Sequence, residues 1–174
     1  MGTGRSGGYS GTRGGSQPYA ETYHVVDEML KMDRKDPDIY DPKLGYFKNP
    51  SAISLLDAVR NNRFYQKNGK KTEGEFMYVM DKYGNIIFGK RDNPNDGRKR
   101  SPHPTLIGGK DPQVQCAGII TFRDGKILSV NNQSGHYRQN IKSMAKVEAF
   151  LEKLYKENSL LFNKESKWRQ RKNG

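Results

Sequence analysis

The sequence predicts an α+β domain, in which N-terminal helices precede a four-stranded antiparallel sheet and a C-terminal helix packs against that sheet. Two pairs of apolar segments, each pair joined by a glycine-containing turn, predict the four strands. Apolar residues at one-turn spacing near both ends of the chain predict the helices. The chain has 174 residues, of which 33% are hydrophobic, so it suits one compact domain with a modest core and tails.

The first 71 residues divide into a leader and a helical part. Residues 1–17 are rich in glycine and poor in apolar side chains, which predicts a flexible leader. Residues 18–71 form the predicted helical N-terminal part. Its first helix begins at Thr22 and has an apolar face made of Val25, Val26, Met29 and Leu30. Its second helix begins at the capping pair Asn49-Pro50 and has an apolar face made of Ile53, Leu56 and Val59.

Residues 72–157 form the predicted α+β core. One hairpin is expected over 76–88 and a second over 114–130, where an Asp-Gly pair gives a strong tight-turn signal. The apolar positions of 144–154 recur at helical spacing, and we expect this helix to cover the sheet. Residues 158–174 are predicted to be a basic tail with a frayed end.

The composition excludes several classes of protein. No apolar stretch is long enough to span a bilayer, and no apolar segment follows the first residues, so neither membrane insertion nor a cleaved secretory signal is expected. A single cysteine, Cys116, excludes an intramolecular disulfide framework, and the three histidines lack the spacing of a metal site. The net charge of +12 favours a polyanionic partner, such as nucleic acid, an acidic protein or an anionic cofactor.

Two glycine-containing segments, 102–110 and 131–138, carry the groups best suited to chemistry. The first lies in the long polar segment between the predicted hairpins, and the second lies between the last strand and the last helix. Each contains one histidine, His103 or His136, and imidazole is the side chain best suited to proton transfer at neutral pH. Such a pair can supply the acid and the base of metal-free RNA cleavage, while cations and hydroxyls hold the phosphate.

These two segments define the candidate site. The candidate catalytic residues are His136, His103, Tyr137 and Ser134. The candidate substrate-binding residues are Arg138, Lys110, Thr105, Gly108, Gly109 and Gly135. A structural alternative stays open, in which residues 134–137 form a capped turn and both histidines are structural groups.

Five short motifs within residues 76–155, about half of the chain, form a familiar pattern: His103-x-Thr105, Gly108-Gly109, Ala117-Gly118, Asp124-Gly125-Lys126 and Ser134-Gly135-His136-Tyr137. The pattern resembles a domain found in bacterial polymorphic toxins, and a similar string occurs in plant calmodulin-binding proteins of the IQ-motif class. The chain departs from the pattern at Gln139, where proline is expected, and at Pro104-Thr105, where paired serines are commoner.

The resemblance implies a toxin tip that a specialised system secretes as part of a larger protein. Such a domain acts in the cytoplasm of a target cell, is neutralised by an immunity protein, and is joined at its N-terminus to a delivery module. The favoured activity is a metal-independent ribonuclease that needs no cofactor. One alternative is an ADP-ribosyltransferase-type toxin that consumes NAD, with Tyr137 packing the nicotinamide. A second alternative is a non-enzymatic module that binds an acidic partner such as calmodulin through residues 141–171.

Overall fold

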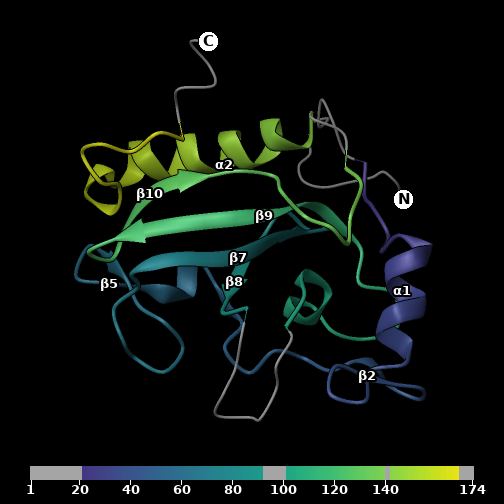
Figure 1. Ribbon diagram of the computed structural model, residues 1–174. Coiled ribbons are helices and arrows are strands. Elements are labelled where there is room, and N and C mark those ends of the chain that lie inside the picture. Colours follow the sequence, from purple (N-terminus) through teal and green to yellow (C-terminus); the bar gives the residue numbers. More distant parts are fainter. Residues whose placement is uncertain (1–20, 92–100, 140–141, 169–174) are drawn as a thin grey trace.

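A five-stranded antiparallel sheet forms the centre of the molecule (Figure 1). The computed structural model describes residues 21–91, 101–139 and 142–168. The strand order is β10-β9-β7-β8-β4. The strands are β4 (Ile53–Ser54), β7 (Gly74–Asp81), β8 (Ile86–Gly89), β9 (Val114–Arg123) and β10 (Lys126–Val130). The predicted α+β class is confirmed, with five strands in the sheet where the sequence predicted four.

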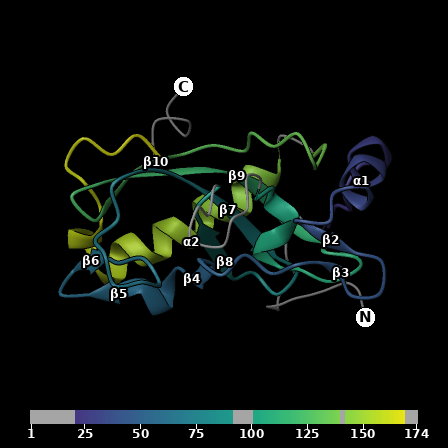
Figure 2. The ribbon, with the colours of Figure 1, turned by 60° about the horizontal axis from the view of Figure 1, so that its bottom comes forward.

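Helix α2 (Ser143–Glu157) covers one face of the sheet, and a group of smaller elements covers the other. These elements are α1 (Asp27–Arg34), the small hairpin of β2 (Tyr40–Asp41) and β3 (Gly45–Tyr46), and the short 3-10 helix η3 (His103–Leu106). Figure 2 shows α1 beside β2 and β3, at the opposite end of the molecule from β5 and β6. The sheet is therefore the middle layer of three.

Strand β7 shows how both faces of the sheet are buried. Phe76, Tyr78 and Met80 belong to the core under α2. Met77 and Val79 belong to the second core, on the side of α1 and η3. Because successive side chains of a strand point to opposite faces, a strand covered on both sides is apolar at nearly every position.

The second predicted helix, over residues 50–60, is wrong. The segment instead forms the edge strand β4, a 3-10 turn η1 (Leu56–Ala58) and strand β5 (Val59–Arg60), which pairs with β6 (Arg63–Phe64). The Asn61-Asn62 pair, expected to end a helix, adopts positive φ angles of 51° and 63°. Two such residues make the type I′ turn of a hairpin. The β-branched Ile53 and Val59 suit the paired strands in which they lie.

The C-terminal tail is not frayed over the residues described. A short 3-10 helix, η4 (Ser159–Leu161), follows α2, and Leu161, Phe162 and Trp168 are buried. The Phe162 and Trp168 rings lie 5.3 Å apart. Backbone hydrogen bonds from Asn163 and Lys167 to β10 fix the segment against the sheet. The tail up to residue 168 is therefore part of the α2-side core.

Three of the expectations fall partly or wholly outside the described residues. The leader, residues 1–17, is one; most of the polar segment before η3, residues 92–100, is another; and the last six residues of the tail, 169–174, are the third. Among the helices of the described ranges, none has the length and apolar character needed to cross a bilayer.

Replacing Trp168 with alanine tests whether the tail belongs to the core. Trp168 is 1% exposed, so the Trp168→Ala variant should lose about 3–5 kcal/mol of unfolding free energy, because a large buried ring is removed and a cavity is left. Urea unfolding followed by circular dichroism measures this loss. Leu160, which is 57% exposed, is the control, and Leu160→Ala should cost far less. Equal stability of the two variants would contradict the packing described.

Candidate functional site

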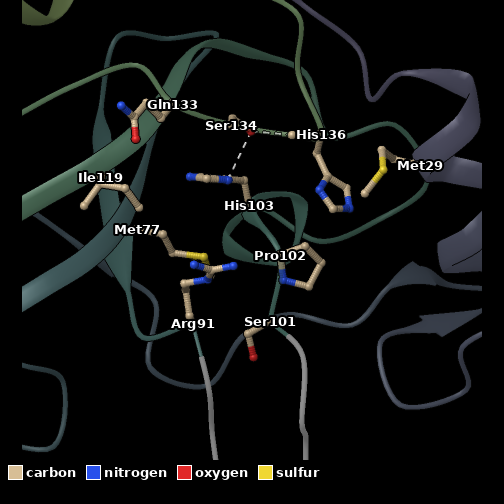
Figure 3. A pocket seen from close by; sticks show the side chains of 11 residues that line it. Met29, Met77, Arg91, Ser101, Pro102, His103, Ile119, Gln133, Ser134 and His136 are labelled. Atoms are coloured by element: carbon tan, nitrogen blue, oxygen red, sulfur yellow. Dashed lines mark hydrogen bonds between the residues drawn. The ribbon is translucent and has the colours of Figure 1, made fainter.

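One pocket of about 470 Å³ lies where η3, α1 and the loop after β10 meet (Figure 3). It is lined by Met29, Met77, Arg91, Ser101, Pro102, His103, Ile119, Gln133, Ser134, Gly135 and His136. Two histidines separated by more than 30 residues thus face one cavity. The long loop between β8 and β9 and the loop between β10 and α2 supply most of the polar groups in its wall.

His103 is held between a backbone carbonyl and a serine hydroxyl. Its Nε2 lies 2.8 Å from the Gly118 carbonyl oxygen, and because a carbonyl only accepts, Nε2 carries the proton. The Nδ1 atom therefore accepts the hydroxyl of Ser134 at 3.1 Å. The pKa of His103 is lowered to about 4, chiefly by burial; the Gly118 bond opposes this, and the charges of His136 and Arg91 add to the lowering. The ring is neutral at pH 7.

His136 is held by a buried carboxylate. Its Nε2 lies 2.8 Å from Oδ2 of Asp33, and the same oxygen accepts the Tyr46 hydroxyl at 2.7 Å. Asp33 is fully buried. Burial of Tyr46 and the neighbouring Asp33 carboxylate raise the pKa of Tyr46 well above its ordinary value. The Tyr46 hydroxyl therefore stays protonated and donates to Asp33. The backbone N–H of Val26 also donates to the His136 carbonyl. These contacts fix the ring and leave Nδ1 as the nitrogen that can exchange a proton in the pocket.

The loop after β10 is tied to the central strand β9 by polar side chains. The Asn131 carbonyl oxygen would lie 2.0 Å from a Cβ atom at position 118, so only glycine allows this approach. The Asn131 side chain accepts the N–H groups of Ile119 and Gln133. Gln139 bonds both the N–H and the carbonyl of Ala117. Gln139, where the sequence resemblance predicted proline, therefore anchors this loop.

The structure brings together four of the predicted site residues, namely His103, Ser134, Gly135 and His136. Figure 3 shows Ser134 between the two histidines, where its oxygen contacts His103 Nδ1 and the backbone N–H of His136. Within this group, Ser134 is half-buried and Gly135 is exposed. These residues therefore combine a hydroxyl, two imidazoles and open backbone at one site.

Tyr137 and Thr105 lie in the protein interior and do not line the pocket. The Tyr137 ring is 1% exposed, and its hydroxyl donates to the Pro112 carbonyl at 2.6 Å. Thr105 is fully buried and its hydroxyl donates to the Pro102 carbonyl, which closes the first turn of η3. The nicotinamide-packing role expected of Tyr137 in the NAD alternative has no geometric support, since the ring belongs to the core.

The remaining predicted substrate-binding residues also lie away from the pocket wall. Gly109 exchanges backbone hydrogen bonds with Tyr46, and Gly108 bonds back to Pro104, so this glycine pair connects η3 to β3. Lys110 lines a separate hollow with Arg34, Tyr40 and Pro42. Arg138 is exposed and forms an ion pair with Glu28 at 2.9 Å.

Two residues of the site, Asp33 and Arg91, are not among the predicted site residues. Asp33 lies in a strongly charged run, which is typical of a solvated helix end. Its position four residues after Met29 places it on the apolar face of α1, and that spacing was the available signal. Figure 3 shows the Arg91 side chain extending into the pocket, and its charge acts on His103.

No family model matches this sequence, and the comparisons with curated proteins and with solved structures give no match. Across residues 21–91, 101–139 and 142–168, no group of three or more potential metal-ligating side chains comes together. The conclusions about function therefore rest on the geometry of the pocket.

The depressed pKa of His103 predicts an acid-dependent loss of stability. The ring has a pKa near 4 in the folded chain and about 6.5 ordinarily, so between these values the unfolded chain binds more protons. The neutral His103 ring therefore makes its full contribution to the free energy of unfolding above pH 6.5. As the pH falls towards 4, this contribution is lost, and the free energy of unfolding decreases by on the order of 3 kcal/mol. Urea unfolding at several pH values, compared between the native chain and His103→Gln, measures this difference; parallel profiles would contradict the buried neutral ring.

Proposed function

We propose that this chain is a metal-independent ribonuclease, acting as the toxin domain of a larger secreted protein. The observation that carries the proposal is the pair of imidazoles on the wall of one pocket, each oriented by a different partner. Proton transfer during RNA cleavage requires oriented groups of this kind. The guanidinium of Arg91 on the same wall provides the positive charge that a phosphate needs.

The proposed role of each histidine follows from which of its ring nitrogens is already bonded to the protein. With Nε2 held by Asp33, Nδ1 of His136 is the atom that takes the proton of a ribose 2′-hydroxyl. The hydroxyl then attacks the adjacent phosphorus, and Arg91 stabilises the charge on the phosphate oxygens. The bond from phosphorus to the 5′-oxygen breaks, and the protonated Nδ1 of His136 returns its proton to that oxygen. His103 complements His136 by holding the Ser134 hydroxyl, which donates to its Nδ1.

The high positive charge supports a polyanionic substrate. The chain carries 31 Lys and Arg residues against 19 Asp and Glu residues, and non-specific binding to nucleic acid is mainly electrostatic. In the proposed setting, secretion delivers the domain to the cytoplasm of a competing cell and a cognate immunity protein protects the producer. Acidic side chains that cover the pocket would be one means of neutralising it.

Cleavage of RNA without metal is the direct test. Total bacterial RNA is incubated with the purified chain in excess chelator, and RNA length and end groups are followed. The native chain should shorten the RNA and leave 2′,3′-cyclic phosphate ends. His136→Ala should reduce the rate at least about 100-fold, because a general acid–base group contributes on that scale.

His24→Ala is the matched control for this test. His24 is 62% exposed and pairs with Asp111 outside the pocket, so its replacement should leave the rate unchanged. Circular dichroism of each variant establishes that the fold is retained. Intact RNA with the native chain, or full activity of a folded His136→Ala chain, would refute the proposed mechanism.

A further inference from the structure

We propose that Ser134 is a nucleophile that attacks phosphodiesters directly, with His103 as its base. The proposal rests on the proposed function only for the presence of a phosphate in the pocket. It widens the substrate class, because a nucleophile supplied by the protein removes the need for a 2′-hydroxyl on the substrate. Phosphodiesters such as DNA and aryl phosphodiesters then become substrates.

The first argument is the hydrogen-bond chain through His103. The Ser134 hydroxyl donates to Nδ1 of His103 at 3.1 Å, and Nε2 of the same ring donates to the Gly118 carbonyl at 2.8 Å. A nucleophile, a base and a group that orients the base are the parts of an activated serine. The carbonyl fixes the tautomer, so the unprotonated nitrogen faces the serine oxygen.

The second argument is that His103 is available as a proton acceptor. Since burial holds its pKa near 4, almost every ring is neutral at pH 7, and its Nδ1 lone pair accepts the Ser134 hydroxyl. Among the titratable and charged side chains on this pocket, His136 and Arg91 both act on the ring and disfavour its protonated form. The proton taken from serine is therefore passed on readily to the leaving group.

The third argument is access for a substrate. Ser134 is half-buried, and the neighbouring Gly135 is exposed, with no atom within 4 Å of where its Cβ would lie. Figure 3 shows Ser134 at the upper edge of the pocket and the Arg91 guanidinium inside it. A phosphodiester seated beside Gly135 has room to reach Ser134, while Arg91 neutralises its charge.

The proposed reaction has two steps, and Ser134, His103 and water supply every group that they need. The Ser134 oxygen forms a bond to phosphorus as its proton moves to Nδ1 of His103, and the bond from phosphorus to the leaving oxygen breaks. Nδ1 returns the proton to that oxygen, or releases it to solvent where the leaving group departs as a stable phenolate. Water then hydrolyses the serine phosphodiester, with the same nitrogen as its base, and releases the phosphate monoester.

Bis(4-nitrophenyl) phosphate separates this proposal from the ribonuclease mechanism, because it is an anionic phosphodiester without a 2′-hydroxyl. The full chain should release nitrophenolate in a burst of about one equivalent, and mass spectrometry should place the nitrophenyl phosphate adduct on Ser134. His103→Gln should slow the burst about 100-fold or more. Ser134→Ala should abolish it.

Ser129→Ala is the control, since Ser129 is half-buried on β10 and outside the pocket, and its burst should match that of the native chain. Thermal unfolding shows whether the Ser134 and His103 variants are folded. RNA cleavage without any burst from the diester would overturn the serine nucleophile and leave the ribonuclease standing. A burst and adduct on Ser134 without RNA cleavage would support the nucleophile and refute the ribonuclease. An adduct on another residue would also overturn the proposal.

Discussion

The buried carboxylate of Asp33 is the constraint on which the α1 side of the molecule depends. A carboxylate without access to water is tolerated only when hydrogen-bond donors satisfy it. Tyr46 and His136 both donate to its Oδ2, and they come from β3 and from the loop that precedes α2. The single oxygen therefore joins three segments, two of which are 103 residues apart. The same arrangement that satisfies the buried charge also sets the orientation of the His136 ring.

Local signals in the sequence were sufficient for strands β7, β8, β9 and β10 and for α2, but they were insufficient for residues 50–60. The second hairpin was predictable because Asp-Gly is a preferred pair for a type I′ turn. Asp124 and Gly125 do adopt the positive φ angles of that turn. The Asn49 side chain does bond to the N–H of Ser51, as a helix cap would. However, the following Ile53 pairs with Phe88 on β8, and no local pattern reveals such a long-range partner. Tertiary pairing therefore decided between two structures that residues 50–60 could adopt.

The candidate site was predictable where its groups are close to glycines and was not predictable where it depends on the fold. His103, Ser134 and His136 were identified from their neighbourhoods, and they line one pocket. Lys110 was also chosen for its local sequence, yet the glycines before it connect η3 to β3 and place its side chain elsewhere. Asp33 comes from α1 and lies 70 residues before His103 and 103 residues before His136. The charged residues around Asp33 in the sequence suggested a solvated side chain. Its burial could not be predicted from them, because it results from tertiary packing.

The two imidazoles of the pocket are anchored to parts of the fold that differ in kind. His103 is bonded to the carbonyl of Gly118, in the middle of β9, which pairs with β7 and β10 on its two sides. His136 is bonded to α1, an eight-residue helix at the margin of the molecule. Local opening of a peripheral element requires less free energy than disruption of a central strand. Undocking of α1 would therefore release His136 while His103 stays bonded to β9, so the pocket can lose one of its two imidazoles without global unfolding.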